Sequence, residues 1–390
     1  MCKLKSMVMV SSLAMLLMVN AQAKPYIPKD GAQILERLPA SNAPEMAEFK
    51  RMRAALAASP DDIMLACALA KRYIERSRNE GDPRYLGYAQ AALSPWWKML
   101  QPPLPVLVLR ATLLQSTHRF NESLADLNSV LKMDRHNGQA WLTRATVLQV
   151  QGRYDEARKS CEQLYPLAPE LITLTCLDNV ANLSGQAHKS YEELKQALAN
   201  SPRTDTGIQV WVLTLLAEMA VRMGDSSQAQ QHFRQAMALE PPDTYLLGAY
   251  SDFLLDQQRP AEVIALLKDK TRVDALLLRY ALALKALNSP ETAGQIEILK
   301  QRFDAAMLRG DTVHQREQSR FELQLRGNAE EALKVAQLNW AVQKEPADVR
   351  TFLEAATAAN DKDAAQPLLG WLKSTGLEYA ALTPLIARLQ

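Results

Sequence analysis

The residues that could do chemistry are few and scattered along this 390-residue chain. The five histidines do not cluster with one another or with cysteine; they are His118, His136, His188, His232 and His314. The sequence contains no HExxH motif, no GxSxG nucleophile turn, no glycine-rich phosphate loop and no CxxC pair. We therefore predict no catalytic residue, no metal site and no cofactor.

One aspartate pair, Asp61-Asp62, offers two carboxylates that could contribute to a metal site. A metal-binding aspartate motif would need a third carboxylate, and Leu65 stands at that place. The pair also follows Ser59-Pro60 directly. We interpret the two aspartates as the N-cap and first-turn acids of a helix, where negative charge stabilises the helix terminus.

The predicted helices that carry these side chains belong to a sequence pattern that repeats roughly every 34 residues. A glycine is followed 17 residues later by a proline three times, as Gly152 and Pro169, Gly185 and Pro202, and Gly224 and Pro241. Glycine can adopt the positive φ that ends a first helix, and proline cannot continue a second one. Small residues such as Ala145 and Ala157 would let the two helices approach closely. The pattern predicts stacked helical hairpins, since one hairpin cannot bury its apolar face alone.

The clearest unit, Gly138–Leu171, resembles the tetratricopeptide repeat family. Its GRYDEA segment, Gly152–Ala157, is similar to the family's turn and the start of its second helix. The resemblance implies an all-α fold, a right-handed α-solenoid of stacked helix-turn-helix hairpins. The composition agrees, because 48% of the residues are hydrophobic and no alternating β-branched run is long enough for a sheet.

The match to the family varies along the chain. Departures include His118 where glycine is usual and Asp178 where a small residue is expected. Residues 59–93 read as a widened repeat, and Trp96-Trp97 either forms an aromatic anchor or packs beneath the N-terminal helices. We expect four segments: a signal peptide at 1–23, an N-terminal helical block with a divergent repeat-like unit at 24–103, clear repeats at 104–243 and degenerate repeats at 244–390.

The N-terminus has the layout of a secretory signal peptide. Lys3 and Lys5 precede an apolar stretch, Met7–Val19, and Ala21–Ala23 forms a small-x-small cleavage site. The apolar core of about 13 residues is shorter than the ~20 that a membrane helix needs, and no other stretch was found to reach that length. We expect cleavage after Ala23 and a periplasmic mature protein without a membrane span.

The charge of the mature chain argues against nucleic acid as a partner. Removing Lys3 and Lys5 takes the formal net charge from +2 to 0. A neutral chain with mixed charges lacks the basic footprint that phosphate backbones require.

Three cysteines would remain after cleavage. Cys161 and Cys176 fall on helices that are neighbours in consecutive repeats, and an oxidising compartment would allow them to form a disulfide. The alternative is that both are small buried apolar side chains, as free cysteine usually is. Cys67 lies in a segment rich in alanine and leucine and is expected in the core.

In tetratricopeptide repeat proteins the first helix of each repeat lines a concave groove. The resemblance assigns that role to residues with mostly amide and hydroxyl side chains, namely Thr112, Gln115, Thr146, Gln149, Asn179, Asn182, Trp211 and Thr214. Amides can hydrogen-bond an extended backbone, which suits a protein or peptide segment as partner. The same residues could instead form solvated helix faces. The lining lacks the Lys/Asn clamp that the family uses for acidic chaperone tails, because Val108 and Leu142 stand in its place.

Together these features predict an exported, non-enzymatic scaffold that binds a protein or peptide in the cell envelope, with an undetermined oligomeric state. One alternative is an all-α envelope enzyme acting on peptidoglycan, since Glu122-Ser123 matches the catalytic dipeptide of exported transglycosylases. The repeat itself, however, calls for an acid followed by a small residue at that place. The other alternative is a scaffold for polysaccharide export, which would need aromatic side chains along the groove, where only Trp211 qualifies.

Overall fold

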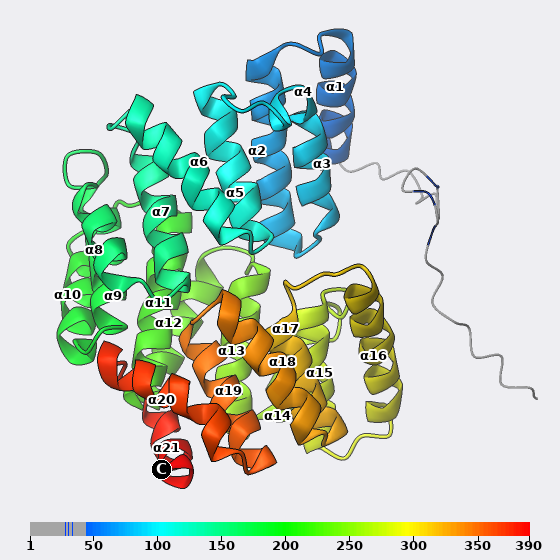
Figure 1. Ribbon diagram of the computed structural model, residues 1–390, viewed down its shortest axis with the longest axis vertical. Helices are drawn as coiled ribbons and strands as arrows, with labels where there is room; N and C mark the ends of the chain where they lie inside the picture. Colours follow the sequence, from blue (N-terminus) through cyan, green and yellow to red (C-terminus); the bar gives the residue numbers. More distant parts are fainter. Residues whose placement is uncertain (1–27, 29, 31–32, 34–43) are drawn as a thin grey trace, which may run out of the picture. The chain divides into compact units, whose positions relative to one another are not determined.

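The computed structural model describes residues 28, 30, 33 and 44–390 (Figure 1). The predicted signal segment, residues 1–23, lies outside the described residues. The chain divides into two compact units, residues 1–40 and 41–390, and the second unit carries every described helix. The described part of the chain contains helices and no strand, which confirms the predicted all-α class.

The helices follow one another with short connections. They are α1 (Pro44–Ala58), α2 (Ile63–Glu80), α3 (Arg84–Ala92), α4 (Ser94–Trp97), α5 (Leu104–Ser116), α6 (Phe120–Met133), α7 (Gly138–Val150), α8 (Tyr154–Glu162), α9 (Glu170–Asn182), α10 (Ala187–Ala199), α11 (Thr206–Met223), α12 (Ser226–Leu239), α13 (Thr244–Asp256), α14 (Pro260–Leu267), α15 (Asp274–Ala286), α16 (Thr292–Leu308), α17 (Gln315–Arg320), the π-helix η1 (Phe321–Arg326), α18 (Ala329–Val342), α19 (Pro346–Ala359), α20 (Lys362–Thr375), the 3₁₀ helix η2 (Ala380–Leu382) and α21 (Thr383–Leu389). Successive helices pack as hairpins, beginning with α2 and α3 and continuing from α5 and α6 to α19 and α20.

The bends of the hairpins lie where the sequence pattern predicted them. Gly152, Gly185 and Gly224 connect the two helices of their hairpins with φ of 72°, 82° and 80°. His118 and Gln258 take the same left-handed conformation, with φ of 57° and 56°. The departure from glycine at His118 therefore leaves the bend unchanged, although a side chain in this region is strained.

Small residues fill the crossings within the hairpins. Ala145 and Ala157 are buried, as the predicted close approach requires. Trp96 is also buried, in the apolar cluster formed by α2, α3 and α5, which agrees with packing beneath the N-terminal helices and not with an exposed anchor. Asp178 is buried as well, and burial raises the pKa of its carboxyl to about 7.

The last hairpins of residues 41–390 pack against the bends of the earlier ones (Figure 1). The Lys344 N–H donates to the Val150 carbonyl at 2.7 Å, and the Ala187 N–H donates to a Glu378 carboxylate oxygen at 3.2 Å. The Trp371 ring lies 6.0 Å from the Tyr154 ring, centroid to centroid. Because of these contacts, α19 to α21 lie beside α7 to α11 even though they are far apart in the sequence.

We expect Gly152→Ala to destabilise the protein more than Gly327→Ala does. Both glycines have positive φ, 72° and 70°, so alanine is strained at either place by about 1 kcal/mol. At Gly152 the added Cβ would also lie 3.0 Å from Trp371, whereas at Gly327 it would meet nothing within 4 Å. This crowding should cost about 1–2 kcal/mol more.

Urea unfolding of the two variants measures this difference, with Gly327→Ala as the matched control. Equal losses of stability would show that α20 does not press on the bend at Gly152.

One described helix, α11, is long and apolar enough to cross a membrane by length and composition alone. The expectation that no apolar stretch beyond the N-terminal one reaches the length of a membrane span is therefore wrong for α11. Half of its apolar window is buried, and α11 packs against α12 and α10 in the manner of a core helix.

Candidate functional site

The predicted groove threonines use their hydroxyl groups within their own helices. Thr112 donates to the Val108 carbonyl at 3.0 Å, and Thr146 donates to the Leu142 carbonyl at 3.0 Å. Thr214 donates to its own helix as well and is buried. The hydroxyls of Thr112 and Thr146 therefore keep only acceptor capacity for a partner.

Three predicted groove amides remain available. Gln115, Gln149 and Asn179 lie on α5, α7 and α9, the first helices of three consecutive hairpins, and each is half-buried. Within the described residues, none of their side-chain amides makes a hydrogen bond, and none is a buried unsatisfied group. Each amide can thus donate to and accept from an incoming backbone.

Asn182 has a different role from the one predicted. It is fully buried, its amide donates to the Ala187 carbonyl at 3.0 Å, and its oxygen accepts from Nε and Nη2 of Arg222 at 3.1 and 2.7 Å. The prediction of a groove contact is wrong for Asn182 and for the buried Thr214, because neither side chain is accessible. Trp211 is half-buried and packs against the apolar core of α11 to α13.

The structure adds a cavity of about 390 Å³ that the sequence pattern did not indicate. Its charged lining comes from α11, α13, α17 and α19, and consists of Glu218, Arg222, Asp252, Asp256, Arg320, Arg350 and Glu354. Six of these residues form three pairs, and the two members of each pair are four residues apart on the same helix: Glu218 and Arg222 on α11, Asp252 and Asp256 on α13, and Arg350 and Glu354 on α19. These pairs lie on the first helices of their hairpins, which are otherwise apolar. Their spacing is a sequence signal that could have indicated the cavity.

Most of these charges neutralise one another. Asp252 accepts from Arg279 at 2.5 Å and from Arg320 at 2.9 Å. Arg350 pairs with Asp256 at 2.6 Å and with Glu354 at 2.7 Å. Burial opposes ionisation of Asp252, but the guanidinium groups of Arg279 and Arg320 more than offset it and hold the pKa of this carboxyl far below its usual value.

Comparison with known proteins decides the identity of the central hairpins. Residues 173–302, from α9 into α16, match a family model described as tetratricopeptide repeat. These residues are tetratricopeptide repeats. The resemblance noted for the sequence is thereby confirmed for the hairpins within residues 173–302. A search of curated proteins found no match.

Solved structures similar to this chain include a tetratricopeptide repeat protein from Parabacteroides merdae, which is 16% identical with a TM-score of 0.41, over 65% of this chain and 90% of that one. The Cut9–Hcn1 hetero-tetramer of APC/C is 13% identical with a TM-score of 0.44, over 79% of this chain and 59% of that one. Yeast Tom70 is 15% identical with a TM-score of 0.35, over 83% of this chain and 61% of that one.

Two consecutive hairpins are joined covalently. Cys161 on α8 and Cys176 on α9 form a disulfide, with their Cα atoms 5.5 Å apart. Of the two alternatives that the sequence left open, the structure has the bonded one. Cys67 is free and half-buried.

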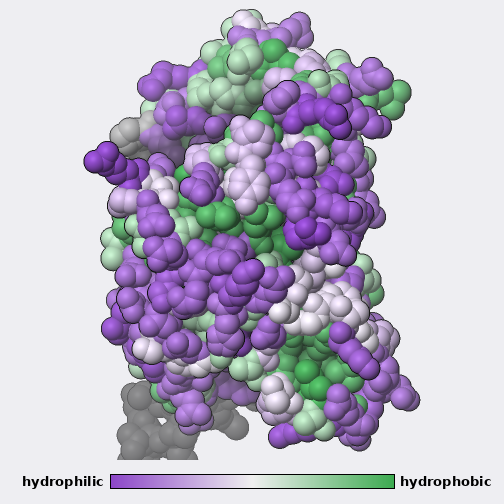
Figure 2. All heavy atoms as spheres, turned by 90° about the vertical axis from the view of Figure 1, so that its left-hand side faces the viewer, coloured by the Kyte–Doolittle hydropathy of each residue, from purple (hydrophilic) through white to green (hydrophobic). Residues whose placement is uncertain are grey.

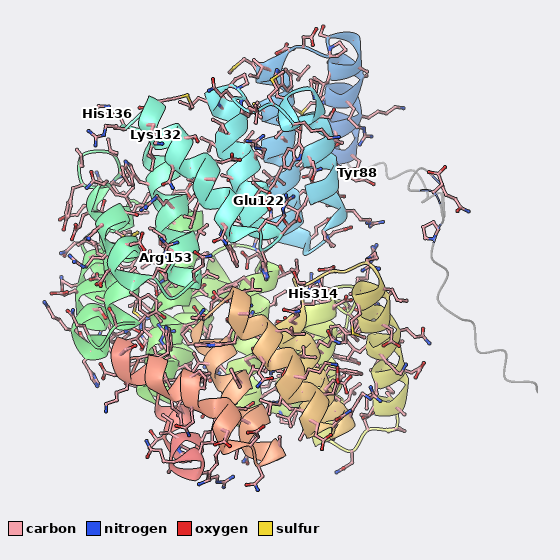
Figure 3. The ribbon with its side chains drawn as sticks, in the orientation of Figure 1. Tyr88, Glu122, Lys132, His136, Arg153 and His314 are labelled. Carbon is pink, nitrogen blue, oxygen red and sulfur yellow. A yellow bond between two sulfur atoms is a disulfide. The ribbon has the colours of Figure 1, made fainter. Side chains whose placement is uncertain are left out.

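Glu122 does not have the environment of a catalytic acid. It lies at the start of α6 (Figure 3), where it is exposed. Its carboxylate pairs with Arg119. The hydrogen bond from Arg119 lowers the pKa of Glu122, whereas a general acid needs a raised pKa. Ser123 is buried and donates to the Ala111 carbonyl at 2.8 Å. The dipeptide therefore has a structural role at the hairpin crossing.

Within the described residues, no group of three or more histidine, cysteine, aspartate or glutamate side chains could hold a metal ion. Figure 2, which faces the left-hand side of Figure 1, shows apolar areas separated by a mostly hydrophilic surface. The surface of this face is thus mixed in character.

Proposed function

We propose that this chain is an exported, non-catalytic tetratricopeptide repeat scaffold that binds a protein or peptide segment in the bacterial cell envelope. The observation that carries the proposal is the row of accessible amides formed by Gln115, Gln149 and Asn179 on three consecutive first helices. An extended segment that crosses these helices can exchange backbone hydrogen bonds with each amide in turn.

The location is supported by two independent features. The N-terminal segment has the charge, apolar core and cleavage site of a secretory signal. The Cys161–Cys176 disulfide is a bond that persists in oxidising compartments such as the periplasm and is rare in the cytosol.

A scaffold role without catalysis is supported by three of the four carboxylates that line the cavity; the exception is Glu218, whose pKa is raised by burial. Asp252, Asp256 and Glu354 each pair with an arginine. The guanidinium groups of Arg279 and Arg320 hold the pKa of Asp252 far below its usual value, so this carboxyl is not a proton donor near neutral pH. No observation favours the peptidoglycan enzyme or the polysaccharide scaffold over this function.

The proposal predicts that Gln115→Ala/Gln149→Ala/Asn179→Ala reduces partner binding by about tenfold or more, since each neutral hydrogen bond contributes about 0.5–1.5 kcal/mol. The measurement is quantitative affinity capture from envelope extract with the secreted form of the chain. A protein enriched by the wild type should be depleted with the triple variant.

The matched control is Gln163→Ala/Gln231→Ala, which removes two exposed amides that make no hydrogen bond within the described residues and lie outside the first helices. This variant should capture the same protein as the wild type. If the triple variant captures as much as the control, the amide row is not the binding surface.

A further inference from the structure

Two charged side chains on one wall of the 390 Å³ cavity have no ionic partner. Glu218 and Arg222 lie one turn apart on α11, and both line the cavity. No ion pair joins either of them to any described residue, although each of the other charged residues that line the cavity forms at least one.

Arg222 is a buried cation with spare donors. Its residue surface is 7% exposed, and its Nε and Nη2 atoms donate to the Asn182 oxygen. Within the described residues, nothing accepts a hydrogen bond from Nη1. A neutral amide oxygen does not offset the charge, and Glu218 offsets it through space without a salt bridge, so the guanidinium keeps two free N–H groups for a further acceptor.

Glu218 is the corresponding anion. One carboxylate oxygen accepts from the Tyr245 hydroxyl at 2.8 Å, and no described residue donates to the other. Burial raises the pKa of Glu218 and lowers the pKa of Arg222, and the attraction between the two groups opposes both shifts without cancelling them.

The remaining charges of the lining do not favour a simple anion or cation. Asp252 pairs with both Arg279 and Arg320, and Arg350 pairs with both Asp256 and Glu354, so three arginines balance three carboxylates. What is left unpaired is one positive and one negative group, side by side on α11. The complement of such a pair is a small molecule that carries both charges a few bonds apart.

The size and the other walls of the cavity agree with a small ligand. Its volume of about 390 Å³ lies at the lower end of the range for small-molecule sites. The lining also includes Thr351 from α19, Tyr379 from the segment between α20 and η2, and Gln324 from the π-helix η1. π-Helical turns are frequent at functional sites. A ligand here would contact α11 and the C-terminal residues together.

We propose that this cavity binds a free α-amino acid, with its ammonium group on Glu218 and its carboxylate on Arg222. This binding site is additional to the peptide surface of α5, α7 and α9. Because the cavity has walls from α11, in the middle of the repeat stack, and from α19 and Tyr379, near its C-terminal end, the amino acid stabilises the packing of α19 and Tyr379 against α11.

The test is a thermal-unfolding screen of the full secreted chain with the twenty amino acids, each at millimolar concentration, beside its N-acetyl and its amide derivative. At least one free amino acid should raise Tm by about 2 °C or more, since ligand binding to the native state adds stability. Its N-acetyl form, which lacks the ammonium group, and its amide, which lacks the carboxylate, should each give a clearly smaller shift.

Variants then locate the site by calorimetric titration of that amino acid. Glu218→Gln and Arg222→Gln should each weaken binding about tenfold or more, and Arg222→Lys should retain more affinity than Arg222→Gln. Asn182→Ala removes the acceptor of the Arg222 hydrogen bonds but leaves the cation in place. It should lower the stability of the fold and still bind the amino acid more tightly than Arg222→Gln does, which separates a loss of folding from a loss of binding. Arg234→Gln, at an exposed position of α12, is the control and should bind as the wild type does.

The proposal is overturned if no free amino acid shifts Tm, if a derivative with a single charge shifts it equally, or if Glu218→Gln and Arg222→Gln bind as the wild type does. Partner capture through the amide row is measured separately, so failure here leaves that proposal standing.

Discussion

Replacing Asp252 by asparagine is expected to lower the free energy of unfolding by about 3 kcal/mol. Asp252 accepts hydrogen bonds from Arg279 on α15 and Arg320 on α17, whose side chains are only 8% and 15% exposed. Asparagine has nearly the same shape but no negative charge, so two largely buried guanidinium groups would lose their counterion. Urea unfolding of the wild type and the variant at neutral pH measures the loss.

The control for this substitution is Glu331→Gln, which breaks the exposed pair with Lys334. An exposed pair contributes little, and its loss should change stability by less than about 1 kcal/mol. A loss as small as this in Asp252→Asn would show that solvent already screens the buried pairs.

The same network makes a prediction about pH. The pKa of Asp252 is depressed in the folded protein, so its stabilisation is fully present above the unfolded value of about 3.9 and is lost as pH falls from there toward the folded value. The difference in stability between wild type and Asp252→Asn should therefore be constant near neutral pH and shrink below about pH 4. A difference that grows on acidification would contradict this account.

Loss of the Cys161–Cys176 disulfide should have an effect of similar size. The bond links residues 15 apart in the sequence and holds α8 against α9. Closing a loop of this length stabilises a protein by about 3 kcal/mol, chiefly by restricting the unfolded chain. We expect Cys161→Ser/Cys176→Ser to unfold at lower urea concentration than the wild type, and reductant to shift the wild type toward the variant.

Cys67→Ser is the control for the disulfide, because Cys67 is free. Reductant should destabilise Cys67→Ser as much as it destabilises the wild type, and should leave the double variant unchanged. Alkylation of the oxidised, denatured wild type should label neither Cys161 nor Cys176. Labelling of both, with no effect of reductant on stability, would show that the two thiols are free in the protein.

The chain's local features could be predicted because they depend on neighbours in the sequence. Gly152, Gly185 and Gly224 were identified as bends from their type and spacing, and each has the positive φ that glycine permits. Cys161 and Cys176 could be placed near each other for the same reason, since the repeat puts them on adjacent helices. The groove amides Gln115, Gln149 and Asn179 followed from their repeat positions.

The contacts between distant hairpins could not be predicted in this way. The position of Trp371 against Tyr154 depends on a small rotation from each hairpin to the next, summed over the whole stack, and no local pattern specifies that sum. The burial of Asn182 beside Arg222 depends on the same packing, and so does the cavity between the central and the C-terminal hairpins. The sequence by itself determined the hairpins, their bends and the nearness of Cys161 to Cys176, whereas the structure showed that the two cysteines are bonded. Only the tertiary structure decided which charged side chains converge, because that depends on helix orientations accumulated over more than a hundred residues.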